Sequence, residues 1–185
     1  MQHFPLLFLT IFGIIGSLFH HEPHANNLEN DRIEWNAERL LNWDDFQGNL
    51  AYDNPSIAAL TSSLIQYRYY CNEHNFLEIE VTAIFLKSES YVRNEARTSE
   101  YLEHEQLHFD ITEVYARRLR QKLNKKIYNC NEVNEVENIA NQYIDEWREV
   151  EKKYDRTTQN SLNRATQIKW NQYISQKLKE IPILP

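Results

Sequence analysis

Residues 101–120 read YLEHEQLHFDITEVYARRLR and contain the pentapeptide HEQLH. Its two histidines, His104 and His108, are four residues apart, and residues at this spacing stand one above the other on one face of an α-helix. Both imidazoles can therefore reach one zinc ion. Glu105 lies about 100° further round the helix, where its carboxylate can take a proton from water at that ion. This H-E-x-x-H pattern predicts a metal-binding helix.

The residues around the pentapeptide favour a helix with one buried face. At about 100° per residue, both histidines fall on the side that carries three large apolar residues, Ile111, Tyr115 and Leu119. The opposite side is charged, and we expect its residues to face solvent: Asp110, Glu113, Arg117 and Arg120. The same geometry excludes Asp110 and Glu113 as ligands of that ion, so a third ligand must come from elsewhere. The alternative is that the histidines are structural residues of a plain α+β domain.

Composition and charge limit the classes of protein that the chain can belong to. Its 185 residues, 42% of them hydrophobic, suffice for one domain with a core of its own. The net charge of −7 argues against nucleic acid as a partner, because phosphate binding needs a clustered basic face. Three glycines and five prolines are too few for a sandwich or barrel full of tight turns.

The N-terminus carries an apolar segment, FPLLFLTIFGIIGSLF, at residues 4–19. It is short for a membrane span and suits the apolar region of a secretory signal peptide. We expect residues 1–22 to form a signal peptide or an uncleaved N-terminal anchor, residues 23–31 a linker and residues 32–185 a single domain. The protein would then be periplasmic, secreted or anchored in the envelope, and would contact a membrane only through this segment.

Cys71 and Cys130 are the two cysteines of the chain. An even number of cysteines in an exported chain permits one disulfide, which here would close a long loop. Two buried free thiols are the alternative. A zinc site of the C-x-x-C type is excluded, because the two residues are far apart in the sequence.

The first half of the remaining chain has the pattern of a small antiparallel sheet. Residues 58–71 are rich in β-branched and aromatic side chains, and residues 76–87 alternate between apolar and polar types, so both segments are predicted strands. Residues 72–75 form a plausible hairpin connection, and residues 88–92 a loop or turn. Apolar side chains near the start of the domain, Trp35, Trp43 and Phe46, are predicted core or lid residues.

The second half has the pattern of three helices. Ser99 is the candidate N-cap of the helix with the HEQLH motif, which is predicted to end near residues 122–126. Residues 131–153 and 159–179 carry apolar side chains at three- and four-residue steps, which predicts two further amphipathic helices. Strands followed by helices predict an α+β fold, with about three helices packed against one side of the sheet and a zincin-like active-site helix among them.

Several of these segments resemble a bacterial family known as domain of unknown function 922, whose members are expected to be secreted zinc-dependent proteases. The most specific matching segment is Leu102–Ile111, LEHEQLHFDI. The other matches occur in the family's order along the chain: Leu40–Phe46, Ala58–Ser63, Tyr154-Asp155 followed by Thr158, and the pair Gln167 and Trp170.

The resemblance implies that His104 and His108 are zinc ligands and that Glu105 is the general base. The family's C-terminal pattern, Tyr-Asp-x-x-Thr-x-His, supplies a third histidine ligand, and the aligned residue of this chain is Asn160. An asparagine carbonyl is a poorer zinc ligand than an imidazole. Asp155 and His74 are substitutes that no feature of the sequence places beside the motif.

The resemblance implies an exported zinc-dependent metallohydrolase, a peptidase that acts on a peptide or protein substrate. Zn²⁺ is the predicted cofactor. Because Asn160 stands where the family has histidine, the alternative is a catalytically degenerate envelope domain that binds a partner without cleaving it.

Overall fold

The computed structural model of the protein describes residues 30–49 and 57–182. The predicted signal peptide or anchor, residues 1–22, lies outside the described residues, as does most of the predicted linker. Within the described ranges, none of the helices combines the length and the apolar character that a bilayer crossing demands.

An antiparallel sheet of three strands, in the order β1-β4-β3, forms one layer of the fold. Its strands are β1 (Arg32–Glu34), β3 (Ser63–Cys71) and β4 (Leu77–Leu86). Two residues of β2 (Ala59–Leu60) pair with two of β5 (Tyr91–Val92) in a separate small sheet. The prediction of a small antiparallel sheet in the N-terminal half is thus confirmed, whereas β1 and β5 lie in segments for which no strand was expected.

The predicted strand at residues 58–71 is interrupted at Thr61 and Ser62. The Ser62 amide donates to the Ser90 hydroxyl at 2.9 Å, and the Thr61 hydroxyl donates to the carbonyl oxygen of Glu105 at 3.2 Å. The Ser62 carbonyl still accepts from the Leu86 amide of β4 at 2.9 Å, and the Thr61 hydroxyl holds the break against the helix that carries the HEQLH motif.

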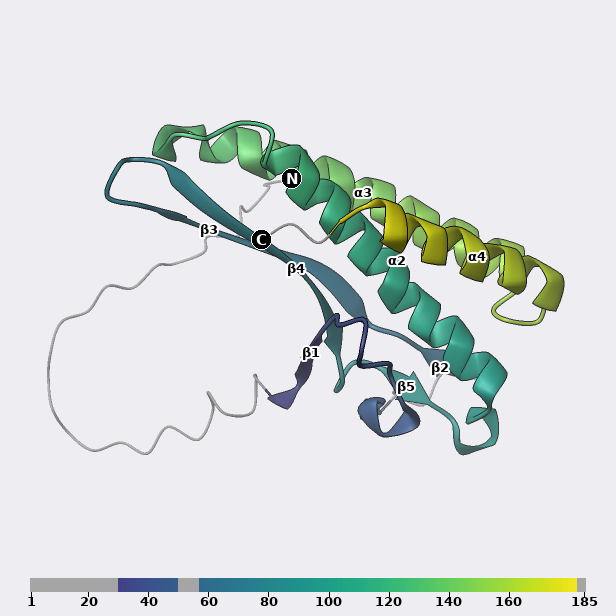
Figure 1. Ribbon diagram of the computed structural model, residues 1–185. Coiled ribbons are helices and arrows are strands. Elements are labelled where there is room, and N and C mark those ends of the chain that lie inside the picture. The colour runs from purple at the N-terminus through teal and green to yellow at the C-terminus, as the bar shows by residue number, and fades with distance from the viewer. Residues whose placement is uncertain (1–29, 50–56, 183–185) are drawn as a thin grey trace, which may run out of the picture.

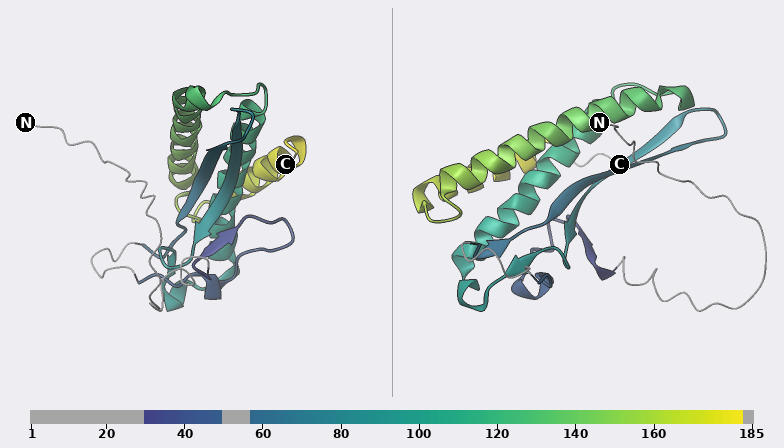
Figure 2. Two further views of the ribbon diagram at one scale, coloured as in Figure 1. Left: turned by 90° about the vertical axis from the view of Figure 1, so that its left-hand side faces the viewer. Right: turned by 180° about the vertical axis from the view of Figure 1, so that it is seen from behind.

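Three long helices follow in the chain: α2 (Ser99–Leu123), α3 (Val133–Thr158) and α4 (Arg164–Glu180). Short 3₁₀ helices precede or connect them: η1 (Trp43–Asp45), η2 (Asn94–Ala96) and η3 (Cys130–Glu132). Helix α2 lies between the β3–β4 hairpin and the pair α3 and α4, and contacts all four elements (Figures 1 and 2). The predicted α+β arrangement with about three helices is confirmed.

Several helix ends differ from the predictions, and the last helix, α4, begins at Arg164 rather than at residue 159. The N-cap of α2 is Thr98 rather than Ser99, because the Thr98 hydroxyl accepts a hydrogen bond from the Tyr101 amide. Helix α3 continues past its expected end at residue 153, as far as Thr158, and closes on Gln159 in the left-handed conformation, with φ 53°. This extra length of α3 carries Tyr154 and Asp155 alongside α2.

The core is built on α2 and the inner face of the sheet. Ile111, Ala116 and Leu119 of α2 are fully buried, and Phe109 packs against Phe85 of β4 with ring centroids 5.7 Å apart. Of the aromatic residues predicted to be core or lid, Phe46 is buried and contacts Phe85, while Trp35 and Trp43 are partly buried against the core.

The charged side of α2 does not face solvent as predicted. Glu113 and Arg117 are buried, and the Glu113 carboxylate forms ion pairs with Arg117 at 2.8 Å and with Arg120 at 2.9 Å. Arg117 also donates to the carbonyl oxygens of Leu178 and Ile181 at the end of α4. Arg120 donates to the Val81 carbonyl of β4. Because each of these charges has a partner of opposite sign and the guanidinium groups also reach backbone carbonyls, this face of α2 can hold α4 and the sheet together.

We expect the substitution Glu113→Gln to lower the free energy of unfolding by about 3 kcal/mol, because two buried guanidinium groups lose their counter-ion. Chemical denaturation of the variant measures this loss. Glu149→Gln is the matched control, since Glu149 is exposed and pairs only at the surface with Lys152. A midpoint equal to that of the unmodified protein would show that the buried ion pairs do not hold the layers together.

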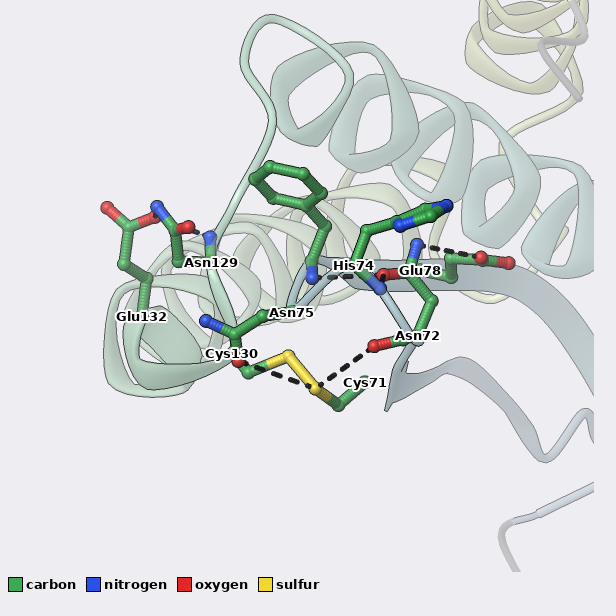
Figure 3. Close-up of a disulfide and its surroundings, with 9 residues drawn as sticks. Cys71, Asn72, His74, Asn75, Glu78, Asn129, Cys130 and Glu132 are labelled. Carbon is green, nitrogen blue, oxygen red and sulfur yellow. Dashed lines mark hydrogen bonds between the residues drawn. A yellow bond between two sulfur atoms is a disulfide. The ribbon is translucent and has the colours of Figure 1, made fainter.

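A disulfide joins Cys71 at the end of β3 to Cys130 in η3, across 59 residues of sequence. Figure 3 shows that it ties the β3–β4 hairpin to the segment that leads into α3. A backbone hydrogen bond from the Cys130 amide to the Asn75 carbonyl supports the same junction. The cross-link therefore fixes the start of α3 relative to the sheet.

We expect the double substitution Cys71→Ser and Cys130→Ser to lower the free energy of unfolding by about 3–4 kcal/mol, because the open chain regains the entropy of a long loop. Denaturation curves of the oxidised protein, the reduced protein and the double variant test this. The reduced protein and the variant should agree, and a reduced protein as stable as the oxidised one would contradict the expectation.

Candidate metal site

Both histidines of the motif lie in the N-terminal half of α2 and face α3. His104 is 3% exposed and His108 is largely buried, so the helical periodicity placed both rings correctly on the inner side. Their Nε2 atoms are 3.3 Å apart, and the two ring planes are nearly perpendicular. Because both Nε2 atoms point to a common position, these rings can serve as ligands of one ion.

Asp155, near the end of α3, completes a group of three donor atoms. Its Oδ1 lies 2.9 Å from Nε2 of His108 and 3.3 Å from Nε2 of His104. Two ligands of a tetrahedral zinc ion, each at 2.0–2.1 Å, are about 3.3–3.4 Å apart. The two distances from Nε2 of His104 therefore have the size that one shared zinc ion requires, and the distance of 2.9 Å between Asp155 and His108 is somewhat shorter.

The Nδ1 atoms point away from this position and are held by residues of the two neighbouring helices. Nδ1 of His104 contacts Oε1 of Gln167 in α4 at 3.0 Å, and Nδ1 of His108 contacts the Glu151 carboxylate of α3. The other oxygen of Glu151 accepts from the indole N–H of Trp147 at 2.8 Å. Acceptors at Nδ1 leave Nε2 available as the ligand atom, as is usual for metal-binding histidines.

Carboxylates around His108 determine its protonation. Burial by itself would lower the pKa of His108, but Glu151 and Asp155 outweigh that effect and hold the pKa well above its ordinary value. Burial would raise the pKa of Asp155, yet its contacts with both histidines hold the pKa well below the usual range. These carboxylates thus favour a positive charge on or beside His108, and binding of a cation by Nε2 would release the proton of the imidazolium.

Glu105 is buried beside the histidines, and one of its carboxylate oxygens makes no hydrogen bond to the described residues. Its side chain reaches the cleft, and Oε2 has no hydrogen-bond partner among the described residues. Burial raises the pKa of the Glu105 carboxyl, against the opposing effect of His108 and His104. A buried acceptor without a partner is costly, and here it lies next to the converging donor atoms.

A cleft of about 460 Å³ opens over these groups. One wall is the extended segment 57–63, which includes β2 beside the N-terminal half of α2 in Figure 1, and the other wall comes from α3 and the turn after it. The Asp155 carboxylate is 44% exposed, so the donor atoms are reachable from the cleft. Tyr154 closes the opposite side, with its ring stacked on His104 at 4.6 Å between centroids.

The remaining sequence-predicted ligands have different positions. Asn160 lines the cleft from the turn after α3. Its backbone N–H donates to the backbone carbonyl of Asp155 at 3.1 Å. His74 is exposed in the β3–β4 hairpin, close to the disulfide (Figure 3). Of the two substitutes considered for the third ligand, Asp155 therefore lies at the histidines and His74 does not.

Two residues at the site had no predicted role, Glu151 and Gln167. A signal for Glu151 exists in the sequence, because Trp147, Glu151 and Asp155 follow at four-residue steps and share one face of a helix. Gln167 is fully buried in α4, and its position was noted only as part of the family resemblance. Nothing in the spacing of α4 relates it to the HEQLH motif.

Residues 93–162 match the model of a family described as "Bacterial protein of unknown function (DUF922)". The matched range includes the HEQLH motif, Glu151, Asp155 and Asn160, whereas Gln167 and the segment Leu40–Phe46 lie outside it. The match bears out, over these residues, the predicted resemblance to this family. No curated protein and no solved structure matches the chain.

We expect Asp155→Ala to weaken Zn²⁺ binding by at least the 10–100-fold that loss of an outer-shell partner causes, because a direct ligand is removed. Asn160→Ala is the matched control from the same cleft and should change the dissociation constant little. Competition with a chromophoric chelator measures both values.

The reverse ranking, with Asn160→Ala the more damaging variant, would assign the third ligand to Asn160, as the family alignment implies. Asp155 would then have only a supporting role beside the two histidines.

Proposed function

We propose, from the match of residues 93–162 to the DUF922 family model, that the chain is a zinc-dependent hydrolase that cleaves peptide bonds. One observation carries the proposal: three donor atoms converge in an open cleft beside a buried carboxylate that has an oxygen without a partner. Structural histidines would need no such carboxylate beside them, and burying it would then only lower the stability of the fold.

His104, His108 and Asp155 would hold the ion. When bound, zinc supplies a Lewis acid that polarises the scissile carbonyl and makes water a nucleophile at neutral pH. Glu151 keeps His108 oriented through Nδ1, and Trp147 in turn holds Glu151. Three protein ligands leave one position open, which is the composition of catalytic rather than structural zinc sites.

Glu105 would move the proton. Its free Oε2 takes a proton from the attacking water and then delivers it to the amine nitrogen of the leaving group, so the carboxylate is regenerated. The raised pKa of Glu105 suits this task, because a base is most effective when its pKa is near the working pH.

The shape of the cleft favours an extended peptide as substrate. Its wall at residues 57–63 includes β2, which pairs with β5 on one side and has no second partner among the described strands. A peptide in extended conformation can add to such an edge through main-chain hydrogen bonds.

An exported location is part of the proposal. The disulfide between Cys71 and Cys130 supports it, because such bonds form and persist in oxidising compartments.

The second candidate is a metal-binding domain that does not catalyse. It is favoured by Asn160, which replaces the histidine of the family pattern. Because Asp155 offers a carboxylate to the same group, the ion would still be held, and the two candidates differ only in whether cleavage occurs.

We expect Glu105→Gln to lower kcat/KM for peptide hydrolysis by about 10²–10⁴-fold while the protein still binds one equivalent of zinc, because the variant loses the base but keeps all three ligands. Cleavage of a mixed peptide library, followed by mass spectrometry, measures the loss. Glu149→Gln, on the exposed surface of α3, should cleave like the unmodified protein.

Equal cleavage by Glu105→Gln and the unmodified protein would refute the proposed role of Glu105. Stoichiometric zinc with no cleavage by either protein would leave the non-catalytic domain as the function.

A further inference from the structure

We propose that Gln167 is a positioning residue that selects the tautomer of His104, and that Asn171 and Glu103 impose the orientation of the Gln167 amide. Glu103, Asn171, Gln167 and His104 form what we call the amide relay. The proposal deepens the proposed function, because its consequence is a lone pair on Nε2 of His104, directed at the site where zinc would bind.

The relay is a continuous chain of hydrogen bonds between α2 and α4. The Asn171 amide nitrogen donates to the Glu103 carboxylate, and the Gln167 amide nitrogen donates to Oδ1 of Asn171 at 2.8 Å. Oε1 of Gln167 then contacts Nδ1 of His104 at 3.0 Å. Arg164, at the start of α4, also pairs with Glu103 and fixes the outer end of the chain.

The direction of the chain follows from its outer end. An ionised carboxylate can only accept, so Asn171 must turn its nitrogen to Glu103 and its oxygen to Gln167. Gln167 must then use its nitrogen toward Asn171, which leaves Oε1 for His104. An amide oxygen also only accepts, and Nδ1 of His104 therefore carries the proton.

Without the relay, His104 would have a choice of tautomer. Its Nε2 lies 3.3 Å from Oδ1 of Asp155, which could accept a proton from that side. The Tyr154 hydroxyl touches both polar atoms of the Gln167 amide and also the backbone carbonyl oxygen of His104, at 3.2 Å. When it donates to that carbonyl it accepts from the Gln167 nitrogen, which favours the same amide orientation. The Glu103 carboxylate imposes this orientation through the chain of amides, and the Tyr154 hydroxyl supports it.

The choice of glutamine at this position has a physical reason. His108 is oriented directly by a carboxylate, Glu151, and the site already contains two further acids, Glu105 and Asp155. Gln167 is fully buried, and an amide there orients His104 without a fourth negative charge. The negative charge of Glu103 remains at the surface, where its side chain is 36% exposed.

The test compares variants of the full chain by two readouts. The first is the ¹⁵N–¹H correlation of the His104 ring in metal-free protein, in alkaline buffer, which reports the tautomer. The second is the Zn²⁺ dissociation constant from chelator competition. We expect Gln167→Met to raise that constant 10–100-fold. Asn171→Leu should raise it less and produce a population with the proton on Nε2, because the Gln167 amide can then turn over.

Two further variants distinguish an effect of the orientation of the Gln167 amide from an effect of side-chain packing. Asn171→Asp keeps an acceptor for Gln167 and should retain the Nδ1–H tautomer, which Asn171→Leu does not. Gln176→Met removes an amide from the exposed face of α4, where it bonds only Glu180, and should change neither readout.

The proposal is overturned if the unmodified protein carries the His104 proton on Nε2, or if Asn171→Leu and Asn171→Asp give the same tautomer. Failure of the proposed function is a different result. A chain that binds no Zn²⁺, or binds it without hydrolysis, would end the hydrolase proposal, while the tautomer measurement still decides the role of Gln167.

Discussion

The cost of removing polar side chains from water is the constraint that arranges this fold around α2. The helix buries His104, Glu105, Glu113 and Arg117, and buried polar groups require partners. The Glu113 carboxylate finds its partners on α2 itself, whereas His104 and Arg117 depend on contacts with α4. The packing of α4 on α2 is therefore specified by polar contacts as well as by apolar area.

The two ends of α2 meet this constraint differently. Around Glu113 each charged group has a partner, since two guanidinium groups share one carboxylate and further donors of theirs reach backbone carbonyls of α4 and β4. Around the histidines the balance is incomplete, because negative groups outnumber positive ones and Oε2 of Glu105 has no partner in the described part of the chain. An excess of acceptor atoms in an open cleft supports the proposal that this site binds a cation.

Much of the fold could be predicted because periodicity reports which face is apolar. The face of α2 that carries His104 and His108 follows from the 3.6-residue repeat, and the two main strands follow from alternation. The same repeat failed for Glu113 and Arg117, because a pattern based on polarity cannot register that opposite charges four residues apart neutralise one another. Pairings between elements distant in the sequence, such as Gln167 with His104, leave no periodic signal at all.

The third donor illustrates a related limit. The family alignment directs attention to Asn160, yet the carboxylate at the histidines belongs to Asp155, five residues earlier and still within α3. Gln159, Asn160 and Ser161 all have positive φ, a conformation unfavourable for residues other than glycine, which asparagine tolerates better than most. The backbone N–H of Asn160 donates to the backbone carbonyl of Asp155 and so closes this turn. An asparagine here can therefore preserve the turn that ends α3, and with it the position of Asp155, without acting as a ligand itself.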